Sequence, residues 1–436
     1  MTICADHRAG EHTAAAHGPH PAALTLAADG SYAARLTRHG DAAGSWYPER
    51  WTIGGPEPYA VPLAGCQPEE PDSGVLPLAD GRVVLVRRVA DRFTVSLLSP
   101  TGPGTREELL GAVVADALTL LPPAPGGLLA YALAPAGPEA TGLWLVHGGT
   151  NGPERVAVVP GRCAGGVWLD HGGRLLALDR ELGGRTKTVL VDLARGGEIS
   201  PLLQITEDSE DRLLLADPDS GLLLVRSNAP GHDRLGWGVL GSARPVRFPE
   251  SLRAPDMAVV PFAVQPGRGR PAEHCAVAFR LEGPGGTRLG VWRPADRRLA
   301  QFPAPDGWLA GSGRWTPEGE LLLPYATAAV PCGVARMAIP LGAVAEGGGP
   351  GAASGTGPGA GAATGAGPVD GSAHAPGIGR ATHAPGAGIV PEAGENAAPS
   401  VPSAPPNSPG AEPFGSPAHP RLCRPVPLQQ APLAAR

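Results

Sequence analysis

Short apolar segments alternate with glycine-containing turns along residues 165–205, and this pattern predicts a small antiparallel sheet. The segments 167–170, 174–180, 187–193 and 200–205 are separated by "HGG", "ELGGR" and "ARGGE". Glycine-containing connections of a few residues between short apolar runs are typical of β-hairpins. None of the segments is long enough for a typical helix, so we expect a meander of four strands.

The same unit recurs about every 45 residues, a period typical of propeller blades. Fourth strands are expected within 59–65, 106–113, 155–161, 199–205, 245–250 and 298–305. Six copies occupy about 22–65, 72–113, 117–161, 165–205, 211–250 and 256–305, and a seventh follows and ends near Pro340. The predicted fold class is therefore all-β, a seven-bladed β-propeller of four-stranded blades.

The seventh copy lacks a fourth strand before the segment 341–420, which consists largely of Gly, Ala and Pro. Such a segment cannot bury enough apolar surface to become ordered. The sequence that follows, "RLCRPVPLQQAPLAAR" at 421–436, regains apolar character, and we expect it to provide the closing strand of the last blade and a C-terminal stub. An insertion of this length adds only on the order of 1–2 kcal/mol to loop closure. The alternative is an inter-domain linker followed by a disordered end.

The expected organisation is thus a disordered N-terminal tail (1–21), a propeller (22–340), a low-complexity disordered insertion (341–420) and the closing strand with its stub (421–436). Blade one draws all its strands from the N-terminal part of the chain, and blade seven draws all its strands from the C-terminal part. We therefore expect an un-latched ring, meaning that the first and last blades share no strand and are held by apolar packing.

The net charge and the cysteines limit the classes of partner and the cellular compartment expected for this protein. The net charge is −6, with acids and bases interspersed, so neither a nucleic acid nor an anionic membrane is expected as a partner. The six cysteines lie far apart without a CxxC motif, which favours free thiols of a cytosolic protein over disulfides. The N-terminus shows no apolar signal-peptide core, and no apolar stretch reaches the length of a membrane helix. We expect a cytoplasmic protein, and 34 arginines against the single Lys187 indicate a high-GC, actinobacterial source.

Motifs for nucleophilic catalysis and nucleotide binding are absent from the sequence. An α/β-hydrolase nucleophile is usually written G-x-S-x-G, and none occurs here. The nearest Gly/Ser clusters surround Ser312, which we expect in a strand or turn, and Ser416, which we expect to be disordered. No G-x-x-x-x-G-K-[ST] pattern exists either. We assign no catalytic, cofactor-binding or metal-binding residue and expect no cofactor.

The histidines carry no metal motif. His7, His12, His17 and His20 fit neither HExxH nor a structural zinc spacing, so we expect a solvated tail. Asp170 and His171 are adjacent on a strand and would point to opposite faces, so these two and His147 are expected in turn and capping roles rather than in a catalytic dyad.

The densest acidic cluster is "ITEDSEDR", which contains Glu207, Asp208, Glu210 and Asp211. Carboxylates of this density raise the question of calcium, but the spacing of an EF-hand is absent. We expect a solvated loop between two blades.

Seven degenerate blades without the Trp-Asp ending of typical WD40 repeats, together with "GRWTPEGELLLPYATAAVPCGVARM" and "CRPVPLQQAPLA", resemble the propeller half of the prolyl oligopeptidase family of serine peptidases, in particular its high-GC actinobacterial members. The resemblance covers 22–340 and 421–434. It implies a propeller that precedes an α/β-hydrolase domain and restricts the access of short or acylated peptides to it. The catalytic Ser, Asp and His of the family lie in the hydrolase domain and have no counterparts in this sequence.

Three functional hypotheses remain open. The first is a non-catalytic, substrate-gating propeller module whose partner is a serine hydrolase domain or chain and whose ligands are peptides. The second is a stand-alone protein-interaction propeller. The third is an enzyme of the lactonase or glycosidase type, which would need several Asp, Glu or His side chains converging at one mouth of the central channel.

Overall fold

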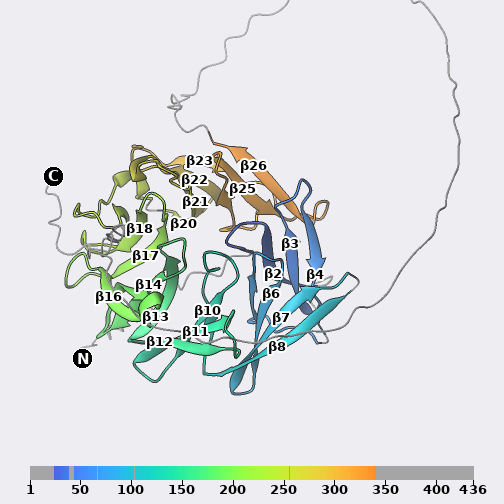
Figure 1. Ribbon diagram of the computed structural model, residues 1–436. Helices are drawn as coiled ribbons and strands as arrows, with labels where there is room; N and C mark the ends of the chain where they lie inside the picture. The colour runs from blue at the N-terminus through green and yellow to red at the C-terminus, as the bar shows by residue number, and fades with distance from the viewer. Residues whose placement is uncertain (1–23, 39–43, 66, 103, 255, 340–436) are drawn as a thin grey trace, which may run out of the picture. The chain divides into compact units, whose positions relative to one another are not determined.

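The computed structural model shows seven antiparallel sheets that follow one another around a ring (Figure 1). The structure describes residues 24–38, 44–65, 67–102, 104–254 and 256–339. The predicted seven-bladed β-propeller is confirmed. The tail 1–21, the insertion 341–420 and the closing strand expected within 421–436 lie outside the described residues.

Within each blade the strands pair with their neighbours in chain order. Blades one to three contain four strands each: β1 (Thr25–Leu26), β2 (Tyr32–Arg38), β3 (Trp46–Thr52) and β4 (Tyr59–Pro62) in blade one; β5 (Gly74–Pro77), β6 (Val83–Val89), β7 (Arg92–Pro100) and β8 (Thr105–Val114) in blade two; and β9 (Thr119–Leu120), β10 (Ala130–Pro135), β11 (Ala140–His147) and β12 (Glu154–Pro160) in blade three. Blades four and six also contain four strands: β13 (Arg162–Trp168), β14 (Leu175–Leu182), β15 (Arg185–Asp192) and β16 (Glu198–Leu203) in blade four, and β20 (Ala258–Val264), β21 (Val277–Gly283), β22 (Gly286–Trp292) and β23 (Ala300–Pro303) in blade six. Three strands are described in blade five, β17 (Asp211–Ala216), β18 (Leu222–Ser227) and β19 (Arg234–Val239), and three in blade seven, β24 (Arg314–Trp315), β25 (Glu320–Tyr325) and β26 (Gly333–Ala338).

The only helical elements in the described part of the chain are three 3₁₀ turns, η1 (Leu193–Arg195), η2 (Glu250–Leu252) and η3 (Ala272–His274). No helix among these residues is long and apolar enough to cross a membrane.

The first strand of each blade lies toward the centre of the ring. First strands of successive blades contact one another, as β13 does with β17, β17 with β20, and β20 with β24. Because the strands alternate in direction, the connections between first and second strands lie on the same face as those between third and fourth strands. We call this the first-turn face.

Aspartates recur at the connections between first and second strands because they cap the turns. Asp29, Asp80, Asp170 and Asp217 each accept a hydrogen bond from a backbone N–H two to four residues later, at 2.9–3.1 Å. Short polar side chains stabilise turns in this way. The recurring acids at these positions are therefore explained by local structure.

Apolar side chains fill the interfaces between adjacent blades. The described residues form seven buried clusters, one for each interface of the ring. The cluster between blades three and four contains Leu143, Leu176 and Leu178, all fully buried, and that between blades five and six contains Phe279 and Trp292, also fully buried. Burial of this apolar surface is the main stabilising contribution to the ring.

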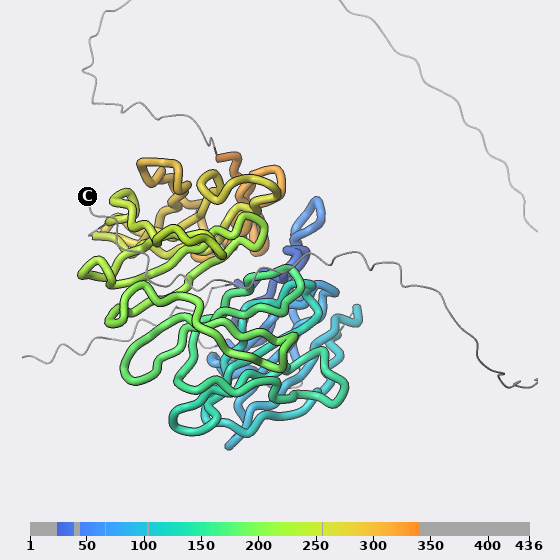
Figure 2. Tube along the Cα trace, turned by 60° about the vertical axis from the view of Figure 1, so that its left-hand side comes forward, coloured from blue at the N-terminus to red at the C-terminus, as the bar shows by residue number. Residues whose placement is uncertain are grey.

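Blades one and seven, the blue and orange parts of the tube in Figure 2, are neighbours in the ring. Side chains hold the seam between them. Leu24 and Trp51 of blade one pack in the same cluster as Leu309 and Val334 of blade seven. The buried Ser312 hydroxyl donates to the Leu24 carbonyl oxygen at 2.6 Å and accepts from the Leu24 N–H at 3.1 Å. No strand is shared between the two blades among the described residues. Residues 1–23 and any outer strand of blade seven lie outside them, so the un-latched ring stays a prediction.

The prediction of a full fourth strand in blade five is wrong, since this segment forms only an isolated bridge. Within 245–250 only Arg247 pairs with the third strand, through a bridge to Trp237 in which each backbone N–H donates to the partner's carbonyl at 2.9 Å. Pro245 and Pro249 lie on either side of Arg247 and have no N–H to donate, so the ladder cannot extend.

Candidate functional site

The sequence candidates for catalysis occupy structural positions. Ser312 lies in a turn, where its N–H donates to the Leu309 carbonyl, and its hydroxyl closes the seam described above. Asp170 caps its turn through the N–H groups of Arg174 and Leu175, both at 2.9 Å. The expected capping role of Asp170 is confirmed, and Ser312 lies in a turn, one of the two positions expected for it. The expectation that Asp170 and His171 lie on a strand is wrong, because β13 ends at Trp168 and both residues belong to the turn that follows. Ser416 and the four N-terminal histidines lie outside the described residues.

The two histidine candidates also make structural contacts. The exposed His171 forms a 2.8 Å hydrogen bond through Nε2 with Asp219 of the next blade's turn, so it links blades four and five. His147 Nδ1 lies 2.9 Å from the Leu128 carbonyl oxygen, and burial lowers the pKa of this imidazole. Neither histidine is paired with a nucleophile.

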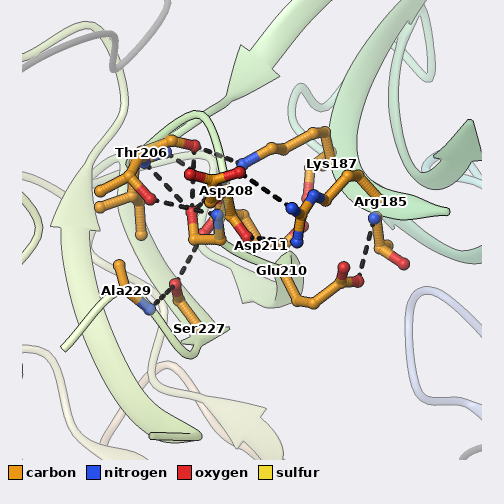
Figure 3. Close-up of polar contacts among 12 residues, drawn as sticks. Arg185, Lys187, Thr206, Asp208, Glu210, Asp211, Ser227 and Ala229 are labelled. Atoms are coloured by element: carbon orange, nitrogen blue, oxygen red, sulfur yellow. Dashed lines mark hydrogen bonds and ion pairs between the residues drawn. The ribbon is translucent and has the colours of Figure 1, made fainter. Parts of the chain in front are cut away.

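The acidic segment 207–211 is only partly the solvated loop that the sequence predicted. Glu207 and Asp208 are exposed, whereas Asp211 is completely buried at the start of β17. Figure 3 shows Lys187, from β15 of blade four, reaching Asp211 across the interface between blades four and five, and Nζ lies 2.8 Å from Oδ2. The prediction failed for Asp211 because its partner is distant in sequence.

The carboxylate of Asp211 is fully surrounded by donors. Besides Lys187, the hydroxyls of Ser209 and Ser227 donate to it at 2.8 and 2.6 Å, and the Ile205 N–H donates at 2.9 Å. A buried charge is tolerated when it is paired and hydrogen-bonded to this extent. The network joins blade four to blade five and engages both carboxylate oxygens of Asp211.

A second buried carboxylate, Asp179 on β14, lies close to the same interface. Its Oδ1 accepts from the Thr188 hydroxyl at 2.8 Å and from the Leu213 N–H at 3.0 Å. Burial raises the pKa of Asp179 to about 6. A shifted pKa marks functional sites in many enzymes, but inter-blade networks produce it too.

The described part of the chain contains neither a cluster of metal-ligating side chains nor a reactive thiol. No group of three or more His, Cys, Asp or Glu side chains there could hold a metal ion. Cys163, Cys275 and Cys332 are free, as predicted. Burial raises the pKa of the Cys163 and Cys332 thiols to about 11, so both are protonated and unreactive at neutral pH.

The most site-like feature is a hollow on the first-turn face of blade six. The connection 265–276 between β20 and β21 is the longest of the seven connections between first and second strands. It is held down at Gly267, whose N–H donates to the buried Asp217 carboxylate of blade five at 2.9 Å. The Ala295 N–H of the connection 293–299 donates to the Glu273 carbonyl at 2.9 Å, which fixes the two connections together.

Four polar side chains line the hollow, which has a volume of about 450 Å³: Gln265, Arg270, His274 and Arg293. Arg293 is oriented by a bidentate ion pair with Asp296, in which Nε and Nη2 each donate at 2.9 Å. Its Nη1 is not used by that pair. Gln265 is buried and its Oε1 accepts from the Ala276 N–H at 3.3 Å, so its amide N–H bonds are the groups that can donate to a ligand.

The hollow has an excess of positive charge. The connections 265–276 and 293–299 contain five arginines and two acids, a formal excess of three positive charges with His274 neutral. Arg270 forms no ion pair within the described ranges, and Glu273 lies 3.8 Å from Arg244 of blade five. The arrangement can bind a carboxylate or another small anion.

This hollow was not predicted from the sequence. One feature of the sequence could have indicated the hollow. The connection "QPGRGRPAEHC" is long and rich in arginine, although the net charge of the chain is −6. Long connections in compact domains are often functional. The second connection, "RPADRRL", is separate in sequence, and only the fold brings it to the same place.

The central channel has few acids on its walls. Among the seven described first strands, Asp211 is the only acidic residue, and it is neutralised by Lys187. Arg162, Arg212 and Arg314 are the basic residues of those strands. The converging acids that a lactonase or glycosidase would need are not supplied by these strands.

Comparison with known proteins identified no matching family model and no matching curated protein. Solved structures do match, and they include propellers of peptidases of the prolyl oligopeptidase family. A Mycobacterium tuberculosis puromycin-hydrolyzing peptidase is 14% identical, with a TM-score of 0.48 over 72% of this chain and 50% of that chain. Prolyl oligopeptidase B of Galerina marginata is 12% identical, with a TM-score of 0.45 over 72% of this chain and 48% of that chain.

The chain therefore spans about half the length of these two peptidases. A third structure is a propeller domain alone, that of the Trilobed protease from Pyrococcus furiosus, described as having an open velcro topology. It is 12% identical, with a TM-score of 0.46 over 71% of this chain and 93% of that chain.

Proposed function

We propose that this chain is a non-catalytic propeller module that gates the access of peptides to a serine hydrolase of the prolyl oligopeptidase type, and that the hollow of blade six holds the C-terminal carboxylate of those peptides. The observation that carries the proposal is the convergence of Arg270, His274 and Arg293 on one hollow of the first-turn face. Catalysis would be supplied by the hydrolase.

The chemistry of the hollow favours a carboxylate. Guanidinium groups bind carboxylates through planar, charge-assisted hydrogen bonds. Asp296 fixes Arg293 in advance, and Arg270 has no competing ion pair in the described part of the chain. The volume of about 450 Å³ is near the lower end of the range for small-molecule sites, so it suits the last one or two residues of a peptide.

The gating role draws support from the sequence and from the ring itself. The degenerate blades and the segment around "GRWTPEGELLLPY" resemble the propeller half of that peptidase family. The seam between blades one and seven depends on a small apolar cluster and on Ser312 rather than on a shared strand within the described ranges. A ring closed in this way can widen without breaking a sheet.

Binding of matched peptides tests the carboxylate site. Calorimetric titration of the full chain with short peptides should show binding of free acids and at least about tenfold weaker binding of the same peptides as C-terminal amides, since a charge-assisted hydrogen bond contributes about 1.5–3 kcal/mol. Arg270→Gln should weaken binding of the free acid to the level of the amide.

The matched control is Arg297→Gln, which removes an exposed arginine from the same face that does not line the hollow. It should bind like the unaltered chain. Equal affinity for acid and amide peptides, or equal losses in both variants, would refute the carboxylate site.

One observation favours the alternative of a stand-alone interaction propeller. The outer strand β8 exposes Leu109 (67%) and Val114 (68%), which are large apolar side chains on the rim of blade two. Exposed apolar residues at this level are common singly, and a contiguous patch would indicate a protein partner. Isolation of a non-hydrolase partner that is lost on Leu109→Asp would favour this alternative.

A further inference from the structure

The outer strand of blade two differs from the other outer strands that the structure describes. β8 is ten residues long, whereas β4, β12, β16 and β23 have four, seven, six and four residues. Those four strands each contain a proline, namely Pro62, Pro160, Pro201 and Pro303, and β8 contains none. Proline on an outer strand hinders further pairing because it has no N–H to donate. Among the described outer strands, β8 alone lacks this protection.

The free part of this edge is the first half of β8. Gly152 of the connection between β11 and β12 lies against Leu110, because a Cβ at Gly152 would come within 2.5 Å of the Leu110 carbonyl oxygen. Pro153 lies against Gly111 in the same way. Residues 106–109, by contrast, are all exposed. A second strand can therefore pair with β8 up to residue 109.

This free half carries opposite charges two residues apart. Arg106 and Glu108 point to the same face of the strand, where they form an ion pair at 3.9 Å with 72% and 57% of their side chains exposed. Glu107 points to the other face, and Arg87 Nη2 donates to its Oε2 at 3.2 Å. The Arg87 guanidinium holds the pKa of the Glu107 carboxyl below its ordinary value. An arginine and a glutamate on either side of a central residue are complementary to a second, antiparallel copy of the same segment.

We propose that β8 is the contact surface for a second copy of this chain, in which residues 105–109 of the two copies pair antiparallel about a twofold axis at Glu107. Arg106 of each copy then lies opposite Glu108 of the other, and Leu109 lies opposite Thr105. The axis is perpendicular to the joined sheet, so side chains of the same face stay together. This inference is independent of the proposed function.

The charges select this register from its neighbours. Because the faces are retained, the axis passes through a residue and not between two. An axis one residue earlier or later would place Arg106 opposite Arg106 or Glu108 opposite Glu108, which is repulsive. An axis at Leu109 would need the part of β8 that blade three covers. The chosen axis also brings two Glu107 carboxylates together, but each is bonded to Arg87 of its own copy.

Sedimentation velocity of the purified full chain over a range of concentrations tests the proposal, and it should show a dimer without any other protein. Arg106→Glu should weaken the dimer at least about tenfold, because the twofold axis turns two cross-strand ion pairs into like-charge pairs. Glu108→Arg should weaken it to the same extent. The double variant Arg106→Glu/Glu108→Arg restores opposite charges and should dimerise like the unaltered chain.

A mixture of the two single variants tests the register separately from any effect within one strand. In a mixed dimer both cross-strand pairs again join opposite charges, so an equimolar mixture should dimerise at least about tenfold more tightly than either variant alone. The matched control is Val158→Lys, at an exposed position of the proline-containing β12, which should leave the dimer unchanged. Both charged side chains are exposed, so the variants should keep the fold, as their circular dichroism will show.

Three results would overturn the proposal. The first is a chain that stays monomeric up to about 1 mM. The second is a dimer that the single charge substitutions leave unchanged. The third is a mixture no more dimeric than its two components.

Discussion

Lys187→Met is predicted to destabilise the propeller strongly, although it changes one side chain far from the hollow. The Lys187 ammonium lies 2.8 Å from the Asp211 carboxylate, and the exposed fractions of the two side chains are 12% and 0%. Methionine keeps the length of the lysine side chain and removes its charge. The substitution therefore leaves a fully buried carboxylate without its cation.

The structure sets the magnitude. Removal of one partner from a buried ion pair costs about 3–5 kcal/mol. Ser209, Ser227 and the Ile205 N–H still donate to Asp211, which places the expected loss toward the lower end of this range. An unfolding entropy of about 2.1 cal/mol/K per residue over roughly 300 residues corresponds to about 1.6 °C per kcal/mol. A loss of about 3–4 kcal/mol should therefore lower the melting temperature by about 5–6 °C.

The assay is scanning calorimetry of the full chain with a matched control. Arg185→Met removes a cation from the same strand, but its partner Asp208 is 86% exposed, so the loss should stay below about 1 kcal/mol. The double variant Lys187→Met/Asp211→Leu should lose less stability than the sum of its single substitutions, since neither charge is left alone. Equal small shifts for Lys187→Met and Arg185→Met would refute the buried-pair interpretation.

Two further predictions concern the seam and the second buried carboxylate. Ser312→Ala removes both hydrogen bonds to the Leu24 backbone and should lower the free energy of unfolding by about 2–4 kcal/mol. Amide hydrogen exchange at residues 24–26 should become faster. Unchanged exchange there would show that Ser312 does not hold the seam. The pKa of Asp179 is raised to about 6 in the folded protein, above its ordinary value of 3.8, so the native state binds the proton more tightly and stability is lost as pH rises from about 4 through 6. Asp179→Asn keeps the acceptor for Thr188 and Leu213 and should melt progressively higher than the unaltered chain as pH rises over that window, and a constant difference from pH 4 to 8 would contradict this.

The seven blades could be predicted from the sequence because their information is local. Turn residues and short apolar runs repeat within each unit, as in "HGGRLLALDRELGGRTKTVLVDL", and the period identifies the propeller. Blade five's outer segment was overestimated because its apolar pattern is present while Pro245 and Pro249 prevent a continuous ladder.

The contacts between blades could not be predicted in the same way. Asp211 belongs to an acidic loop in the sequence, yet it is buried because Lys187, Ser209 and Ser227 arrive from three different elements. The hollow likewise needs the connections of 265–276 and 293–299 to meet on one face. Neighbours across a blade interface have no fixed sequence spacing, so only the fold reveals them.

We propose that this propeller works with a serine hydrolase, and isolation of the tagged full chain from its native cells would reveal that partner. The isolated complex should contain a hydrolase that a fluorophosphonate probe labels, and its cleavage of free-acid peptides should change at least about tenfold when Arg270 is replaced by Gln. A complex without any probe-labelled protein, or one whose partner is not a hydrolase, would contradict the account.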